Sequence, residues 1–237
     1  MNEHLGQSAS QPIFKAPGIV VGLIAVLAGV HLALQIAGEN WQGWSLYVFA
    51  FIPARISGAQ VFPAIYGSEV WSFLTHAFLH ADWPHLLFNS LWLLVFGSVV
   101  ARRLGPLKFL VLAALSAVGG AVAILVLHWG ERVIAIGASG AVSGLLAAAI
   151  PLMYGHVVHE GVSGVGRLSH IKPLRPAEIL TDRRAFFFTL VWILLTLFSG
   201  ASNGFLEGGQ IAWEAHLGGF VVGLLAFYWL DHASGSV

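Results

Sequence analysis

Long apolar runs alternate with short polar stretches along the chain. Residues 18–38 read GIVVGLIAVLAGVHLALQIAG and hold no charged residue. An α-helix rises about 1.5 Å per residue, so a run of this length can cross a hydrocarbon core of about 30 Å. Five further runs follow, at 84–100, 106–128, 136–154, 185–200 and 214–230. The pattern predicts an all-α polytopic membrane protein with six transmembrane helices.

The six predicted spans form one domain, residues 18–231, between a polar tail at 1–17 and a short tail at 232–237. The first run is too long for the apolar region of a cleaved signal peptide, so we expect an uncleaved span. Several later runs are short, which suggests thin membrane or oblique packing. Residues 39–70 form a predicted first loop at the outer interface, where aromatic side chains are common; it carries Trp41, Trp44, Tyr47, Phe49 and Phe51.

Lysine and arginine are unequally divided between the two sides. With six spans, the side of the N-terminal tail carries nine of them and the other side carries two, Arg55 and Arg132. Positive residues stay on the cytoplasmic side, so both termini are predicted to be cytoplasmic. The nine are Lys15, Arg102, Arg103, Lys108, Arg167, Lys172, Arg175, Arg183 and Arg184.

The composition agrees with a lipid environment and excludes several kinds of binding and catalytic site. Of the 237 residues, 57% are hydrophobic and 9% are charged, against about 25% charged in soluble domains. The net charge is zero, so nucleic acid is not an expected partner. Cysteine is absent, which excludes disulfides, thiolate metal sites and a cysteine nucleophile.

Polar side chains recur at one depth in three predicted spans. Buried polar groups without partners cost several kcal/mol in lipid, and intramembrane polar residues usually line a functional cavity. Each residue alone is equally compatible with packing or capping, but their shared depth favours one site. They are His85 and Asn89 in the second span, Ser139 in the fourth and His216 in the sixth.

Two of these spans also carry small residues at a spacing that lets helices pack closely. Residues four apart share a helix face, and GxxxG stripes allow close backbone contact in membranes. We therefore expect the fourth and sixth spans to pack together, which would bring Ser139 and His216 close at the outer end. The predicted stripes are Ser139, Ser143 and Ala147 on the fourth span and His216, Gly219 and Gly223 on the sixth. The glycines with GxxxG spacing are Gly140 with Gly144, and Gly219 with Gly223.

A serine hydroxyl is a weak nucleophile until a base takes its proton, and imidazole is the usual base near neutral pH. Asp82, Glu207 and Glu214 lie in outer loops or at span edges, so a Ser139–His216 dyad is expected rather than a triad.

The developing oxyanion would need hydrogen-bond donors. His85 and Asn89 project from one helix face, and the Ser139 N–H, at a helix N-terminus, is free of intrahelical bonding. All three donors could converge on one oxygen.

The chain resembles the rhomboid family of intramembrane serine proteases in three ordered motifs: HLLFN at 85–89, GASG at 137–140 and AHLGGFVVG at 215–223. The resemblance covers nearly the whole chain. It implies Ser139 as nucleophile, His216 as base and acid, and His85, Asn89 and the Ser139 N–H as oxyanion donors. The supporting residues that it implies are His76, His80, Gly137, Gly140, Gly219 and Gly223.

The resemblance also implies transmembrane protein substrates, a lipid environment, and neither cofactor nor metal. It favours a multi-pass protein of a bacterial inner membrane, with the active site toward the periplasmic or extracellular side. A substrate helix would enter from lipid near the fifth span, although ordinary lipid-facing surface explains its aromatic residues equally well; these are Phe186, Phe187, Phe188, Trp192 and Phe198.

Two positions depart from the family pattern. Ser72 follows Trp71 where many members have arginine, so the family's structural arginine for the first loop has no counterpart at this position. Ser143 stands where many members have an aromatic residue that stacks on the base, and a hydrogen bond is one alternative way to orient His216.

Three other functions are compatible with parts of the pattern. A catalytically inactive rhomboid-like protein would bind or escort membrane proteins, but such relatives lack the serine or histidine. A metal site at His76, His80 and His85 is disfavoured because HExxH is absent. A small transporter would need mid-membrane charges or broken repeats, and His31 with Gln35 is expected to be a packing pair.

Overall fold

The computed structural model describes residues 16–58, 65–157, 171–201 and 212–232. Most of the two predicted tails, together with Arg167 and Glu207, lies outside these ranges.

All six predicted apolar segments are helical. Their bounds are α1 (Gly18–Ala37), α5 (Trp83–Trp92) continued by the π-helix η2 (Leu93–Gly97) and α6 (Ser98–Leu104), α7 (Pro106–Leu127), α8 (Ser139–Met153), α10 (Arg183–Ala201) and α11 (Trp213–His232). Within the described residues, four stretches are long and apolar enough to cross a membrane: Gly18–Ala37, Trp83–Leu104, Pro106–Leu127 and Trp213–His232. The count of six crossings stays a prediction.

The segment predicted as a long first loop is largely helical, so that part of the prediction is wrong. It contains α2 (Glu39–Phe49), α3 (Pro53–Ile56) and the start of α4 (Ser68–Thr75), which continues into a short 3₁₀ turn, η1 (His76–Phe78). The reason is tertiary packing: Phe51 is fully buried and its ring lies 4.8 Å from that of Phe73 in α4. Trp41 and Trp44 are about half exposed, at 57% and 50%.

The connection between α8 and α10 adds a minor exception to the all-α prediction. Two-residue strands β1 (His156–Val157) and β2 (Ile171–Lys172) pair antiparallel, and the short helix α9 (Pro176–Thr181) follows.

Between α6 and α7 the chain turns at Gly105, whose φ of 79° suits glycine, and Pro106 starts the next helix.

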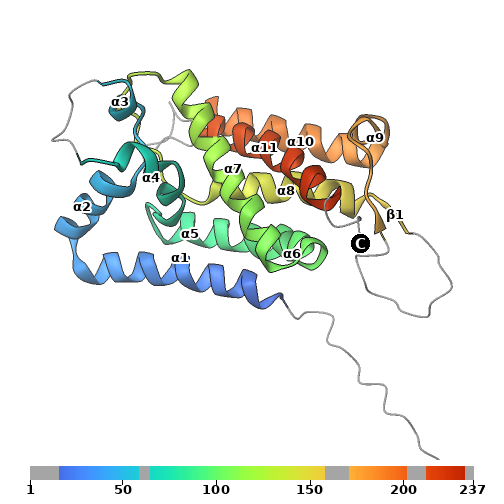
Figure 1. The fold of residues 1–237 in the computed structure, drawn as a ribbon, viewed down its shortest axis with the longest axis horizontal. Helices are drawn as coiled ribbons and strands as arrows, with labels where there is room; N and C mark the ends of the chain where they lie inside the picture. The colour runs from blue at the N-terminus through green and yellow to red at the C-terminus, as the bar shows by residue number, and fades with distance from the viewer. Residues whose placement is uncertain (1–15, 59–64, 158–170, 202–211, 233–237) are drawn as a thin grey trace, which may run out of the picture.

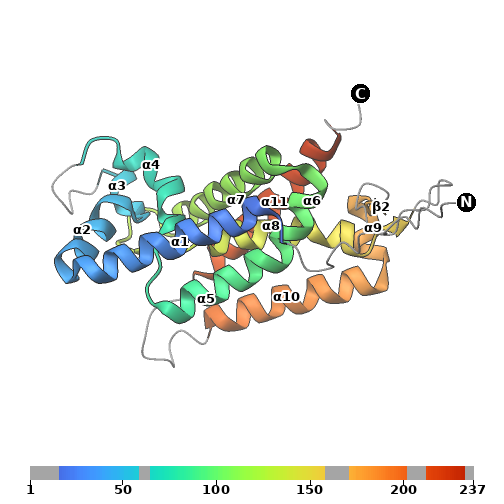
Figure 2. The ribbon, with the colours of Figure 1, turned by 90° about the horizontal axis from the view of Figure 1, so that it is seen from below.

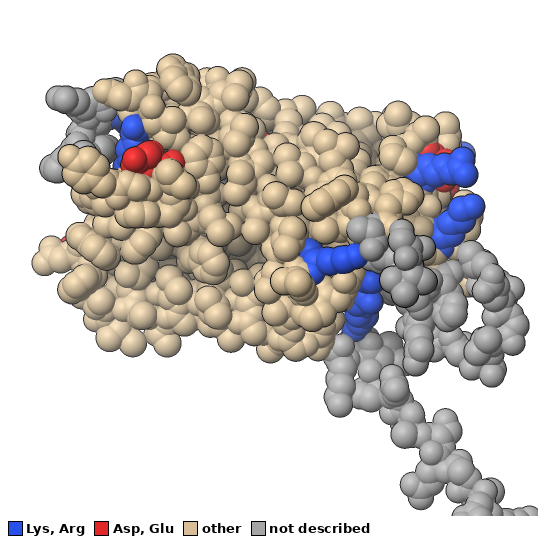
Figure 3. Space-filling view, in the orientation of Figure 1, with Lys and Arg blue, Asp and Glu red and all other residues tan. Residues whose placement is uncertain are grey.

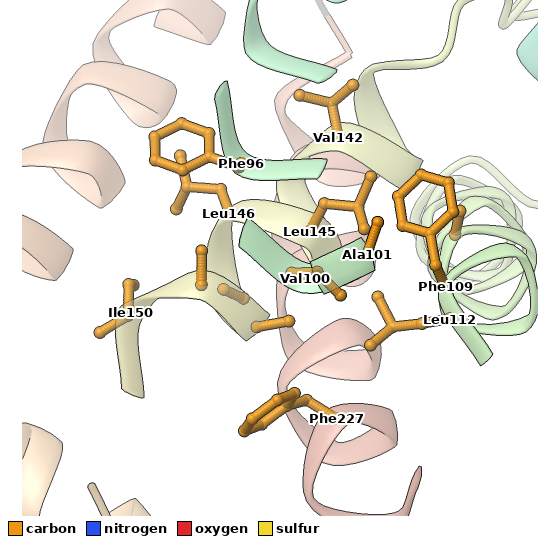
Figure 4. Packing of buried hydrophobic residues seen from close by; sticks show 14 of the residues in the cluster. Phe96, Val100, Ala101, Phe109, Leu112, Val142, Leu145, Leu146, Ile150 and Phe227 are labelled. Carbon is orange, nitrogen blue, oxygen red and sulfur yellow. The ribbon is translucent and has the colours of Figure 1, made fainter. Parts of the chain in front are cut away.

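The core lies where α7, α8 and α11 meet, with α8 at the centre of the bundle (Figures 1 and 2). Every residue of α8 from Val142 to Leu152 is buried. Leu145, Leu146 and Ile150 pack among Phe96, Val100 and Phe227 (Figure 4). With 15 residues, α8 is about 22 Å long, shorter than a hydrocarbon core of about 30 Å. Its first residue can therefore lie below the membrane surface.

On the face drawn in Figure 3, charged side chains gather toward the two ends of the bundle, and the middle of this face shows none. Most Lys and Arg on this face lie at the end that holds α6 and α9. There Arg103 binds Asp231 through two hydrogen bonds of 2.7 and 2.9 Å, and Lys108 donates to the Leu230 carbonyl at 3.0 Å.

Candidate active site

The chain enters α8 through a glycine in a backbone conformation that other residues rarely adopt. Gly137 has a φ of 114°, and its N–H donates to the His76 carbonyl at 3.0 Å. Ser139 is then the first residue of α8 and is half-buried. The N–H groups in the first turn of a helix have no intrahelical acceptor, so those of Ser139 and Gly140 are available to a ligand.

His85 and Asn89 face this glycine from α5. A Cβ atom on Gly137 would lie 2.7 Å from both Cε1 and Nε2 of His85 and 3.8 Å from Nδ2 of Asn89. Asp82 caps α5 by accepting the His85 N–H at 2.7 Å. The Asn89 amide donates to the His85 carbonyl at 3.0 Å and has a second N–H for another acceptor. Both side chains therefore border the backbone that leads into Ser139.

The glycines with GxxxG spacing on α8 and α11 are in direct backbone contact. A Cβ on Gly219 would overlap the Gly140 carbonyl oxygen and lie 2.8 Å from the carbonyl carbon. A Cβ on Gly223 would overlap Gly144 in the same way, and one on Gly140 would lie 3.4 Å from the Ala215 carbonyl oxygen. The turn of α11 that carries half-buried His216 is thereby held against the first turn of α8.

No hydrogen bond between Ser139 and His216 occurs within the described ranges. Their neighbours in the chain, Gly140 and Ala215, are in contact, and His216 lies within electrostatic range of His85. Catalytic hydrogen bonds are often long before substrate binds.

The two upstream histidines lie beside these groups. His76 is buried, and its Nδ1 donates to the Ser72 carbonyl at 2.9 Å. His80 is 8% exposed and meets His85 edge to face, with ring centroids 5.1 Å apart. Both His80 ring nitrogens lack hydrogen-bond partners among the described residues.

Arg55, in α3, binds backbone carbonyl groups at the end of α2 and just beyond it. Arg55 donates to the Ala50 carbonyl at 3.2 Å and to the Tyr47 carbonyl. Trp71 adds a 3.0 Å hydrogen bond to the Val48 carbonyl. Sequence reasoning missed this role of Arg55, because nothing in its local pattern names a partner.

Position 143, where many members have an aromatic residue that stacks on the base, carries a serine. Ser143 is buried, and the described residues include no hydrogen bond from it to His216. Phe220, one turn after His216, instead stacks on Trp192 of α10 with ring centroids 4.7 Å apart.

The aromatic residues of α10 divide into two groups. Phe188 and Trp192 pack against the core, whereas three others are exposed: Phe186 at 44%, Phe187 at 65% and Phe198 at 72%. The exposed group is therefore compatible with substrate entry and equally with ordinary lipid-facing surface.

A carboxylate near His216 is turned away from it. Glu214 bonds to His128, just beyond α7, at 2.9 Å, so it is no third member of a Ser–His–acid arrangement in this structure.

Comparison with known proteins identifies relatives of this chain. Residues 67–232 match the family model described as "Rhomboid domain". The chain is 30% identical over 219 residues to "Rhomboid protease GlpG" of Yersinia pestis (strain Pestoides F) and 25% identical to the same-named protein of Serratia proteamaculans (strain 568). Each alignment covers 91% of this chain and 63% of the relative. The family model spans well over half of the chain, and the described residues include four helices suited to crossing a bilayer, so the protein belongs to the rhomboid family of multi-pass membrane proteins.

Proposed function

We propose that this protein is an intramembrane serine endopeptidase that cleaves transmembrane segments of other membrane proteins. Ser139 is the nucleophile and His216 the general base and acid. The observation that carries the proposal is the meeting of three helix ends around residues 137–140: α5 with its two donors, α8 with the serine and α11 with the histidine.

In the first half of the reaction, Ser139 Oγ adds to the scissile carbonyl carbon while the His216 ring takes the hydroxyl proton. The carbonyl oxygen becomes an oxyanion that accepts hydrogen bonds from His85, the Asn89 amide and the Ser139 N–H. His216 then gives its proton to the leaving nitrogen, the C–N bond breaks, and an ester remains on Ser139.

In the second half, water attacks the ester as His216 takes a proton from it. Collapse of this intermediate releases the carboxylic acid and restores the serine. Because α8 is short and starts beneath the surface, water needs to reach only the outer part of the bundle.

The proposed topology has six crossings with both termini in the cytoplasm and the site toward the periplasmic or extracellular face of a bacterial inner membrane. The basic residues at the α6–α9 end support this orientation. The substrate enters from lipid near α10, whose exposed Phe187 and Phe198 offer an apolar surface. It must unwind locally, because a helix occupies its carbonyl groups with hydrogen bonds.

The alternative function is a catalytically inactive rhomboid-like protein that binds or escorts membrane proteins. The presence of both Ser139 and His216 favours the peptidase. A fluorophosphonate probe separates the two functions, because it forms a lasting adduct only with an activated serine.

The test uses purified protein in liposomes with a single-span reporter substrate. We expect cleavage within or beside the reporter's apolar segment, a probe adduct on Ser139 by peptide mass spectrometry, and loss of cleavage after labelling. Cleavage that continues in fully labelled protein, or an adduct on another residue, would contradict the assigned nucleophile. Absence of both cleavage and adduct would favour the inactive alternative.

Adding one methyl group at Gly137 should impair the oxyanion donors. In Gly137→Ala the new Cβ would press on the His85 ring at 2.7 Å. Because loss of one oxyanion donor costs about 10²–10³ in kcat, we expect displacement of the ring to lower kcat about tenfold. Steady-state kinetics in liposomes measures this, and KM should change little.

The matched control is Gly38→Ala. Gly38 also has a positive φ, 90°, but no atom lies within 4 Å of its added Cβ. The control carries similar backbone strain without contact to the site, so its kcat should match that of the wild type. Equal losses in both variants would show that strain alone, and not the contact with His85, lowers the rate.

A further inference from the structure

His128 lies between two carboxylates at the outer end of α7. Its Nδ1 is 2.8 Å from Glu131 Oε2 and its Nε2 is 2.9 Å from Glu214 Oε1. Only the imidazolium form carries N–H donors at both ring nitrogens. The hydrogen bond with Glu214, followed by that with Glu131, raises the pKa of His128 above its usual value.

The contact between His128 and Glu214 involves the first turn of α11. It is the second residue of that helix and is 9% exposed. A buried carboxylate is costly without a partner, and in the described part of the chain the His128 ring is the group that forms an ion pair with it. The two residues are 86 positions apart in sequence, so their contact ties the start of α11 to the end of α7.

Among the described residues, the charged groups that raise the pKa of His128 are the carboxylates of Glu214 and Glu131. On α3, whose Ala54 N–H binds the Glu131 carbonyl at 3.0 Å, the Arg55 guanidinium bonds to the carbonyls of Tyr47 and Ala50. On α11, His216 also lies within range of the Glu214 charge.

His216 is thus flanked by two anchors on its own helix. Two residues before it, Glu214 is bound to His128; three residues after it, Gly219 rests on the Gly140 backbone. Along α7, Gly120 meets Ala215 closely, since a Cβ there would lie 2.8 Å from the Ala215 carbonyl oxygen. The first turn of α11 is therefore positioned from both α7 and α8.

We propose that the Glu131–His128–Glu214 cluster positions His216 for proton transfer with Ser139, and that it does so only while His128 is protonated. The inference rests on the proposed peptidase function and assigns His128 and Glu214 as positioning residues. They touch neither substrate nor the reacting atoms.

The sign of the pH effect follows from the direction of the shift. A raised pKa means that the cluster is complete below about pH 6.5, the ordinary value for histidine, and is lost as pH rises through the higher value in the folded protein. A neutral imidazole has one N–H and can serve only one of the two carboxylates. We therefore expect kcat to fall on the alkaline side.

The test measures kcat and KM in liposomes from pH 5 to 10 for the wild type, His128→Arg, His128→Gln and Glu214→Gln. Arginine stays charged throughout, so His128→Arg should lose the alkaline fall. The two glutamine variants should show kcat lowered about tenfold with a flat alkaline side, within the roughly 10²-fold that misplacement of reacting groups can cost. KM should stay within about twofold of the wild type. His156→Gln, the same exchange at an exposed histidine of β1, should leave the profile unchanged.

Two results would overturn the inference in distinguishable ways. If the wild type cleaves and Ser139 labels, but His128→Arg keeps the same alkaline fall, the positioning role is wrong and the peptidase function stands. If the wild type neither cleaves nor labels, the proposed function fails and the catalytic role of the cluster fails with it. Thermal unfolding of each variant at pH 6 and 9 separates positioning from folding, because a purely structural role would lower Tm and kcat together.

Discussion

Replacing Ser139 by alanine should lower kcat/KM for cleavage of a transmembrane substrate by about 10³-fold or more, and His216→Ala should do the same. Removal of either group leaves no activated nucleophile, because the hydroxyl and the imidazole act as one unit. The double variant should be no slower than the single ones, since residues that act together are strongly non-additive. Single-turnover kinetics in liposomes measures all three.

Ser143→Ala is the matched control for the nucleophile. Ser143 is one helical turn deeper on the same face of α8 and is buried. Its hydroxyl makes no hydrogen bond to His216 among the described residues, so we expect activity within about threefold of the wild type. Additive losses in the Ser139–His216 double variant would instead indicate two independent roles and contradict the dyad.

The apolar runs predicted the main helices well because lipid requires both continuous hydrophobicity and satisfied backbone hydrogen bonds. The predicted run 106–128 corresponds to α7 at Pro106–Leu127, with Gly105 and Pro106 marking its start. The fourth run was predicted from 136, whereas α8 begins at Ser139. Phe51 pairs with Ala135 across a β-bridge, and Gly137 adopts a positive φ, so the helix cannot start earlier.

Helices α2 and α3 could not be predicted in the same way. Their segment mixes aromatic and polar residues with no sustained helical period, so it resembles a membrane-surface loop. Their packing depends on distant residues: Trp71 binds the Val48 carbonyl and Thr75 the Phe49 carbonyl, 23 and 26 positions away. Such contacts leave no trace in local hydrophobicity.

Motif spacing and predicted depth in the membrane identified the residues of the candidate site, but not all of the contacts around it. The GxxxG spacing predicted close packing of the fourth and sixth spans, and the backbones of Gly140 and Gly219 do meet. Sequence placed Glu214 at a span edge but could not identify its partner. His128 is the last residue of the predicted run 106–128 and gives no signal of its own, because a histidine at the end of an apolar run is most simply a solvated helix end.

A methyl group at Gly219 should separate the two helices that carry the proposed dyad. The added Cβ of Gly219→Ala would overlap the Gly140 carbonyl oxygen, which is backbone and cannot rotate away. Overpacking of this kind costs about 1–3 kcal/mol or more, so Tm in detergent should fall by several degrees. A displacement of about 1 Å between reacting groups can cost 10²-fold, so kcat should fall by about that factor even at temperatures where the variant is folded.

Gly22→Ala is the control for this change, because Gly22 also lies inside an apolar helix, α1, and no atom lies within 4 Å of its added Cβ. Alanine is favoured over glycine in a helix interior by up to about 1 kcal/mol, so Tm should stay level or rise and kcat should not change. A Gly219→Ala variant that kept wild-type Tm and kcat would mean that α8 and α11 tolerate a wider separation. The close backbone contact would then not be what sets the distance between Ser139 and His216.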